Sequence, residues 1–215
     1  MPPARGPMAV CAAATAKPPA PSTFPSAACC RPFGVNWLDN MQAVDLNHAP
    51  DLRKQAKALY HTAFPKEERL PWWLLRLNAC RKGIDLTAFL DGDTFCGFTA
   101  SVTVDDMHFL LFFAIPDDLR GRGYGSAILS QLRQTYPVVT LNIELLDEAA
   151  PNYPQRLQRF AFYRKNGFFD TGYHVWEVGG KFRVLGAEPQ LDVAAYKKIF
   201  KKLSLGVWDV KLQKA

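Results

Sequence analysis

The segment from residue 107 to residue 144 constrains the fold more than any other part of this sequence. Met107–Ile115 is almost wholly apolar, as expected for a strand buried on both faces of a sheet. A glycine-rich turn and an amphipathic helix to about Thr135 follow, and Val138–Glu144 reads as another strand. A strand, a crossover helix and a second strand predict a parallel strand pair.

The segments on either side predict an antiparallel sheet and more helices. Apolar spacing marks the extent of the expected helices, and proline and glycine mark their ends. The turns of the expected hairpins are Asp-Gly and Gly-Gly. The expected helices are 51–64, 71–81, 154–166 and 191–203, and the expected hairpins are 84–104 and 168–185. The predicted fold is therefore α+β, with a mixed, mostly antiparallel sheet, one parallel strand pair and flanking helices.

Length and composition indicate one folded domain with a tail. The chain has 215 residues, and its first 32 contain nine Ala and eight Pro. Such a segment has too little apolar surface to offset the entropy lost on ordering. We expect residues 1–40 to be disordered and residues 41–215 to form a single domain, with a basic C-terminal helix at about 190–204. A natural translation start at Met41 is the alternative that the sequence leaves open.

Charge, hydropathy and cysteine usage exclude several classes of protein. No run of eighteen apolar residues exists, so we expect no membrane partner and a cytoplasmic location. Lys and Arg outnumber acids eight to three between Lys181 and Ala215, but the lysines there fit the solvated face of an amphipathic helix, and no nucleic-acid partner is expected. The five cysteines contain no C-x-x-C pair, which indicates reduced thiols and no metal site.

The turn at residues 120–126, with the sequence Arg-Gly-Arg-Gly-Tyr-Gly-Ser, carries the chemistry. Small residues between a buried strand and a helix let backbone amides approach an anion, and the helix N-terminus adds partial positive charge. The spacing G-x-G-x-G is not the G-x-G-x-x-G of dinucleotide-binding folds, and no Gly-Lys-Ser or Gly-Lys-Thr of a nucleotide-triphosphate loop is present. A phosphate compound of another kind is therefore expected.

This turn resembles the acetyl-CoA motif of the GNAT N-acetyltransferase superfamily, R-x-x-G-x-G, at Arg120, Gly123 and Gly125. A second motif of that family, Tyr-x-x-x-Gly-Phe at a helix end, is matched by Tyr163, Gly167 and Phe168. The resemblance covers about residues 51–185. It implies a sheet whose parallel strands splay around acetyl-CoA, which serves as cosubstrate.

The resemblance also implies roles for individual residues. The main chain of Phe113, Ala114 and Ile115 would pair with the pantetheine arm, and the turn would cradle the pyrophosphate. The residues assigned to the pyrophosphate are Arg120, Gly121, Arg122, Gly123, Tyr124, Gly125 and Ser126. A glycine turn that serves packing alone is the alternative.

Tyr163 corresponds to the family's proton donor. When an amine attacks the thioester, the departing sulfur needs a proton, which a hydroxyl within hydrogen-bond reach can supply. The alternative is an aromatic ring that only packs beside Phe160 and Phe168. Gly167 is interpreted as the C-cap of the helix, where a left-handed conformation is needed.

The proton acceptor is less well defined. The glutamate that some relatives carry on the buried strand falls on Phe109 here, and the neighbouring His108 should face the other side. Glu144, at the end of the parallel strand, is the first candidate, with a salt bridge to Arg156 or Arg159 as its alternative. Glu67 and Glu68, where this fold builds its acceptor pocket, come next. The family's usual asparagine and small residue are replaced by Arg156 and Arg159.

Two functions of different classes follow. The first is an acetyl-CoA-dependent N-acetyltransferase that acts on an amine of a small molecule or peptide without a metal. The second is a non-catalytic acyl-CoA sensor or interaction module on the same fold. Retention of Tyr163 favours the enzyme, whereas the missing strand glutamate favours the sensor. The acceptor is not specified, and the sequence is compatible with a homodimer.

Overall fold

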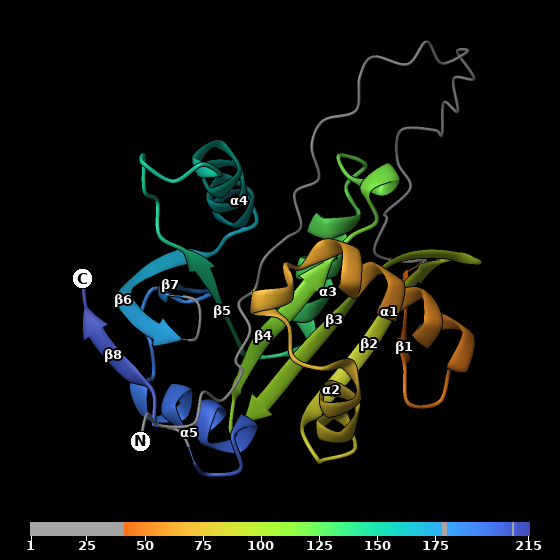
Figure 1. Cartoon of the computed structure of the whole chain (residues 1–215), viewed down its shortest axis with the longest axis horizontal. Coiled ribbons are helices and arrows are strands. Elements are labelled where there is room, and N and C mark those ends of the chain that lie inside the picture. Colours follow the sequence, from red (N-terminus) through yellow and green to blue (C-terminus); the bar gives the residue numbers. More distant parts are fainter. Residues whose placement is uncertain (1–40, 178–179, 208) are drawn as a thin grey trace.

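The computed structural model in Figure 1 describes residues 41–177, 180–207 and 209–215. The predicted tail and part of the predicted turn at Gly179 lie outside these residues. The helices are α1 (Pro50–Ala63), α2 (Trp72–Ala79), α3 (Tyr124–Thr135), α4 (Tyr153–Lys165) and α5 (Val193–Leu203), with short 3-10 turns η1 (Lys66–Glu68) and η2 (Asp117–Leu119). The strands are β1 (Met41–Asp45), β2 (Ile84–Asp91), β3 (Thr94–Val104), β4 (Met107–Ala114), β5 (Val138–Glu144), β6 (Phe169–Glu177), β7 (Gly180–Gly186) and β8 (Lys211–Lys214).

The strands form one sheet in the order β1-β2-β3-β4-β5-β7-β6-β8. Strands β4 and β5 are parallel, as the crossover predicted, and the other neighbours are antiparallel. The mixed, mostly antiparallel α+β fold is confirmed. The two edge strands β1 and β8 were not predicted, because short, largely exposed strands such as Lys211–Lys214 carry no clear alternation of apolar residues.

Helices α1 and α4 differ from their predicted bounds by one residue, and α2 and α5 differ by up to two. Helix α2 begins one residue after Pro71, which takes the N-cap position, and it ends at Ala79 instead of Arg81. Helix α5 begins at Val193 instead of Leu191, because the Asp192 carboxylate caps it by accepting hydrogen bonds from the backbone amides of Ala194 and Ala195.

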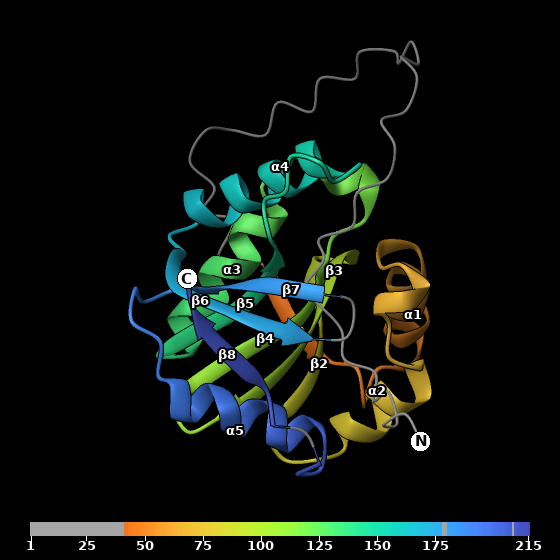
Figure 2. The same cartoon turned by 60° about the vertical axis from the view of Figure 1, so that its left-hand side comes forward.

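Helices cover both faces of the sheet and bury a separate core on each. Figure 2 shows α1 and α2 on one side of the sheet and α3 on the other. The core under α1, α2 and α5 is rich in aromatic residues, among them Tyr60, Phe112 and Phe200. The core under α3 and α4 contains aliphatic residues of α3 and β5 together with Tyr163 and Phe168. In the described residues, no helix is both long and apolar enough to span a membrane.

His108 lies on β4 and faces the α3 side of the sheet, opposite to Phe109 as alternation predicted, and the structure shows that it is buried. Its ring stacks on Tyr136 at a centroid distance of 3.6 Å, and its Nδ1 atom lies 3.0 Å from the Thr103 hydroxyl. Burial lowers the pKa of His108 to about 4, because a charged imidazolium would lose its hydration. The residue is therefore neutral in the folded protein at physiological pH.

Replacing His108 with Phe should remove part of the acid sensitivity of the fold. In the wild type, the unfolded chain takes up a proton near pH 6.5 that the folded chain does not take up until about pH 4. As the pH is lowered from about 6.5 to about 4, His108 should therefore reduce the free energy of unfolding by up to about 1.4 kcal/mol for each pH unit. Urea unfolding at several pH values measures the difference. The exposed His48, changed to Gln, is the control, and equal acid sensitivity in wild type and His108→Phe would contradict the prediction.

Candidate functional site

Strands β4 and β5 separate at the centre of the sheet. Their parallel pairing runs from Met107↔Val138 to Leu110↔Leu141 and then stops. Strand β4 continues to Ala114 along β3, whereas β5 continues to Glu144 along β7, so the two strands diverge as Figure 1 shows. Among the residues that the structure describes, no strand pairs with the inner edges of β4 and β5 beyond this point, so an extended ligand could pair with their backbone groups.

A β-bulge in β4 accompanies this separation. Ser101 pairs with Leu110 and Ala100 pairs with Phe112, so Leu111 is an extra residue in β4. A bulge bends the strand and increases its twist. The predicted main-chain contacts at Phe113 and Ala114 lie just after the bulge, and Ile115 follows the strand end. The Phe113 ring is buried, and its contact with a ligand through the backbone stays a prediction.

The glycine turn lies directly after β4 and opens α3. Gly121 and Gly123 have left-handed φ angles of 73° and 93°, and Gly123 is the N-cap of α3. No atom of the described residues lies within 4 Å of an added Cβ at either position, so packing among these residues does not require the two glycines. The first turn of α3 contains no acidic residue. Its amides can therefore face an anion without competition from a neighbouring carboxylate.

Gly125 differs from the other two glycines, because packing does require it. An added Cβ at Gly125 would lie 3.0 Å from the Phe162 ring and 3.7 Å from the Phe113 ring. The residue therefore allows α3 to approach both α4 and β4 closely. For Gly125, the packing alternative left open by the sequence is supported, whereas Gly121 and Gly123 fit the anion-binding interpretation better.

The side chains of the turn are held to different degrees. Arg120 is half-buried and pairs with Asp117, with 2.6 Å between Nη2 and Oδ1, whereas Arg122 is exposed. Burial lowers the pKa of Arg120, and the positive charge of Arg159 lowers it further against the opposing effect of Asp117. Arg120 of the turn and Arg159 of α4 thus contribute positive charge to the same region.

Tyr124 anchors the start of α3. Its hydroxyl donates a 2.9 Å hydrogen bond to Asp91 Oδ2, at the end of β2. This contact joins the first residue of α3 to the β2–β3 hairpin, and it fixes the helix N-terminus relative to the sheet. Ser126, two residues further on, is half-buried in the first turn of the helix.

Tyr163 lies on the core side of α4. Its side chain is fully buried, with ring centroids 5.3 Å from Phe162 and 5.7 Å from Phe168. These contacts support the packing interpretation and leave the proton-donor role as a prediction. Gly167 has φ 78°, and the Phe168 amide donates to the Tyr163 carbonyl across the helix end. The sequence predicted Gly167 as the C-cap, but Asn166 takes that position, and Gly167 is the left-handed residue that follows it.

A cavity of about 530 Å³ lies at the carboxyl end of β5. Its lining combines several acids with two cations and three apolar residues, namely Glu68, Glu144, Leu145, Leu146, Asp147, Glu148, Arg156, Lys181 and Phe182. Two predicted acids, Glu68 and Glu144, are thus brought together although 76 residues separate them in the sequence. The side chain of Glu67 lies outside the described part of the structure.

Glu144 is engaged by three donors. Arg159 forms an ion pair with Oε2, Arg156 Nε lies 3.5 Å from Oε1, and Asn152 Nδ2 donates to Oε1 at 3.1 Å. The salt bridges that the sequence offered as an alternative are therefore both present. Arg159 is only 7% exposed, and its charge is compensated by Glu144. Both oxygens of Glu144 are already engaged, so its role as base stays a prediction.

Sequence reasoning missed three charged residues of the cavity wall, Asp147, Glu148 and Lys181. The first two directly follow the parallel strand that borders the opening, which is where loops of such strands meet a ligand. That position could have identified them. Lys181 comes from the distant hairpin and carries no comparable signal in the sequence.

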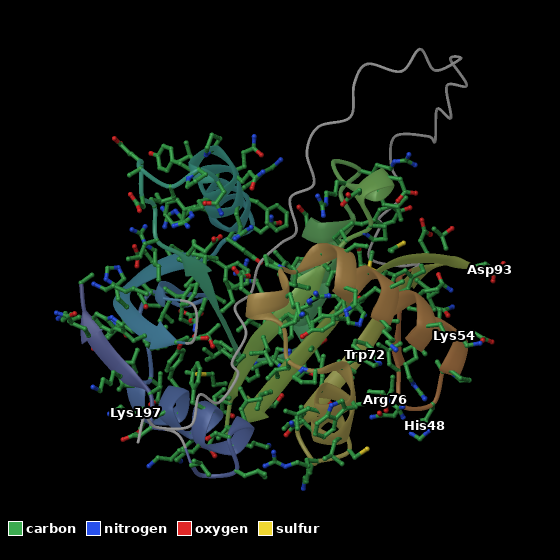
Figure 3. The ribbon with its side chains drawn as sticks, in the orientation of Figure 1. His48, Lys54, Trp72, Arg76, Asp93 and Lys197 are labelled. Atoms are coloured by element: carbon green, nitrogen blue, oxygen red, sulfur yellow. The ribbon has the colours of Figure 1, made fainter. Side chains whose placement is uncertain are left out.

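The basic C-terminal helix does not contribute to this region. Lys197 of α5 lies at one side of the molecule in Figure 3, far from the glycine turn at the start of α3 in the same orientation in Figure 1. Lys198 pairs with Asp105, and the buried face of α5 carries Tyr196, Ile199 and Phe200, as expected for an amphipathic helix. Within the part of the chain that the structure describes, no cluster of side chains could hold a metal ion.

Comparisons with known proteins find similarity in structure alone. Neither models of protein families nor curated protein sequences match this chain. A GNAT-family acetyltransferase from Bacteroides thetaiotaomicron is 22% identical, with a TM-score of 0.62, over 78% of this chain and 99% of its own. An aminoglycoside 6'-N-acetyltransferase complexed with coenzyme A is 16% identical, with a TM-score of 0.53, over 71% of this chain and 99% of its own.

A third similar structure is the ribosomal-protein-S18-alanine N-acetyltransferase from Escherichia coli. It is 15% identical, with a TM-score of 0.50, and the match covers 70% of this chain and 95% of that protein. The shared features are the mixed sheet, the single parallel pair and the helices on both faces. The divergent strands, the glycine turn and these structural matches together show that the chain has the fold of the GNAT N-acetyltransferases.

Proposed function

We propose that this protein is an N-acetyltransferase that moves an acetyl group directly from acetyl-CoA to an amine. The observation that carries the proposal is the opening between β4 and β5, which leads at the end of β4 to the glycine turn. An extended pantetheine arm needs unpaired backbone groups, and a pyrophosphate needs free amides at a helix N-terminus. In this chain, the unpaired backbone groups at the end of β4 are followed directly by the glycine turn and the amides that open α3.

The cofactor-binding residues are proposed as follows. Backbone groups of Phe113, Ala114 and Ile115 would pair with the pantetheine arm. Amides from Gly121 to Ser126 would bind the pyrophosphate, with charge from Arg120 and Arg122. Arg159 lies close enough to Arg120 to lower its pKa, but its charge is already paired with Glu144. When bound, acetyl-CoA supplies a thioester whose carbonyl carbon is open to attack by an amine.

The chain's own residues would handle the protons of this reaction. The attacking nitrogen forms a bond to the carbonyl carbon, and the carbon–sulfur bond breaks. Tyr163 would donate its hydroxyl proton to the departing sulfur, and the nitrogen would lose a proton to a base at the cavity. Glu144 remains the first candidate for that base and Glu68 the second, with Glu67 on the same turn.

The cavity beside β5 is the proposed acceptor site. It borders the opening at Glu144, and its wall combines carboxylates with two cations. A small molecule or peptide that carries an amine suits such a wall, because carboxylates attract the ammonium form before it loses a proton. Similar structures include enzymes named for aminoglycoside and ribosomal-protein acceptors, which supports amine acetylation without selecting between the two.

Two observations favour a second candidate, a non-catalytic acyl-CoA sensor. Phe109 occupies the position of the strand glutamate and packs in the core against Phe200 at 5.4 Å. Both oxygens of Glu144 are held by positive or amide groups. A sensor would bind acetyl-CoA without releasing free thiol in the presence of any amine, whereas the enzyme would release it.

Thermal unfolding with and without acetyl-CoA tests the binding step. A ligand that binds only the folded state stabilises it by about 2.7 kcal/mol at 100 times its dissociation constant. We expect acetyl-CoA to raise the melting temperature, and ATP and NAD to raise it much less. Equal shifts from all three would show that the glycine turn is a general anion site. A panel of amines, followed through free thiol, then separates the enzyme from the sensor.

A further inference from the structure

Three buried polar side chains link β5, β6 and α5 beside the proposed acceptor site. The Tyr196 hydroxyl donates a 2.9 Å hydrogen bond to Asn142 Oδ1, and Asn142 Nδ2 donates to Glu177 Oε1. Glu177 is only 9% exposed, and Asn142 and Tyr196 are at most 1% exposed. The Oε2 atom of Glu177 is buried without a hydrogen-bond partner among the described residues.

This network adjoins the wall of the cavity. Asn142 and Glu144 are two residues apart on β5, so their side chains leave the same face of the strand. They pair with Val184 and Phe182 of β7, and Phe182 and Glu144 both line the cavity. Glu177 belongs to the same face, because Val175, two residues earlier, pairs with Phe182. The position of Asn142 therefore affects the end of β5 that carries Glu144.

The surroundings of Glu177 contain no compensating positive charge among the described residues that face it. Tyr196 from α5 is the titratable group on this side, Asn142 from β5 is neutral, and β7 contributes apolar Phe182 and Val184. The Lys181 ammonium lies over the Trp176 ring, 4.7 Å from its centroid, and is not paired with Glu177. Burial raises the pKa of Glu177 to about 8, and the hydrogen bond from Asn142 offsets this only in part.

We propose that Glu177 is a positioning residue whose neutral form holds the carboxyl end of β5, and with it the acceptor cavity, in the working geometry. The expected effect of Glu177 on turnover rests on the proposed function, whereas its expected effect on stability does not. In the neutral form, the three side chains join strand to helix without a buried charge. Loss of the proton places an uncompensated charge in the core, which favours movement of β5, β6 or α5.

Glu177→Gln provides the test of stability, because the amide keeps the shape and cannot ionise. In the wild type, the folded chain holds this proton up to about pH 8, whereas the unfolded chain releases it near pH 4.5. The stability that the neutral group provides is complete below pH 4.5 and is lost as pH rises through about 8. Between these values, the unfolding constant of the wild type should rise relative to Glu177→Gln by up to about tenfold per pH unit.

Two other variants are matched controls for this measurement. Glu188→Gln removes an exposed carboxyl and should leave the pH dependence unchanged. Tyr196→Phe leaves Asn142 Oδ1 without its donor, so it should lower stability at every pH without removing the dependence on pH. This variant separates loss of a hydrogen bond from loss of the titrating group.

The same proteins test the effect on turnover, at temperatures below melting. At pH 9, about a tenth of wild-type molecules keep the Glu177 proton, so kcat should fall roughly tenfold relative to Glu177→Gln. The KM for acetyl-CoA should change little, because the glycine turn lies elsewhere. A merely structural contact would change kcat equally at all pH values. A higher kcat of Glu177→Gln than of the wild type at high pH alone would therefore indicate the titration of Glu177.

Each outcome decides one part of the proposal. Equal pH dependence of unfolding in wild type and Glu177→Gln would overturn it altogether. Different stability curves with identical pH profiles of kcat would overturn the link to the cavity. If neither protein acetylates any amine while the stability curves differ as expected, the proposed enzymatic function fails and the proton-dependent hold on β5 stands.

Discussion

Tyr163→Phe should lower turnover by about 10² to 10⁴ with nearly unchanged affinity for acetyl-CoA, if the hydroxyl protonates the departing thiolate. The substitution deletes one oxygen and retains the ring that packs between Phe162 and Phe168. The fold and the binding of the cofactor should therefore survive. Free thiol release with an accepted amine measures kcat, and calorimetry measures the affinity.

The variant also separates three roles of this tyrosine. Unchanged turnover would mean that the ring only packs, which its complete burial in the α3-side core also allows. Lower affinity with unchanged turnover would assign the hydroxyl to cofactor binding. Phe168→Leu is a suitable control, because it disturbs the same aromatic cluster and removes no hydroxyl. Until an amine is found, slow hydrolysis of acetyl-CoA can serve as the reaction.

Gly123→Val should abolish the stabilisation by acetyl-CoA. The residue has a φ of 93°, where a β-branched side chain is strained, and it is the N-cap from which the α3 amides face the proposed pyrophosphate. A valine side chain meets no protein atom there, since nothing lies within 4 Å of an added Cβ. The expected cost to the free protein is about 1–3 kcal/mol of backbone strain, whereas the loss of cofactor binding should be complete.

Gly172→Val controls for this strain. Gly172 also has a positive φ, of 73°, with no atom within 4 Å of an added Cβ, and it lies in β6, away from the glycine turn. Both variants should melt at a lower temperature than the wild type. Only Gly123→Val should lose the shift caused by acetyl-CoA. Retention of that shift in Gly123→Val would contradict the assignment of the turn to the pyrophosphate.

The sequence by itself determined the centre of the fold. The apolar run of β4, the glycine turn, the amphipathic α3 and the apolar β5 specify a parallel crossover, because local periodicity and turn residues suffice for each part. The bounds of β5 agree with the prediction to the residue. Gly167 at the end of α4 was equally predictable, since a helix stop needs a left-handed residue.

The edges of the sheet and the partners of the site residues were decided by the tertiary structure. Strands β1 and β8 form because the backbones of β2 and β6 offer free edges, and their own short segments carry little pattern. The strands β4 and β5 diverge after Leu110↔Leu141, where each follows a different antiparallel neighbour. No local signal in either strand marks that point.

Charge pairing over long distances was equally beyond the sequence. Glu144 meets Arg159 only because α4 packs over the end of β5, and the sequence could offer that ion pair only as an alternative to a catalytic role. Glu177 was read as part of an ordinary hairpin strand. Burial raises the pKa of its carboxyl, and Asn142 and Tyr196, which are buried with it, come from elements 35 and 19 residues away. Sequence patterns fix which elements form, whereas the electrostatic state of a side chain depends on which elements close over it.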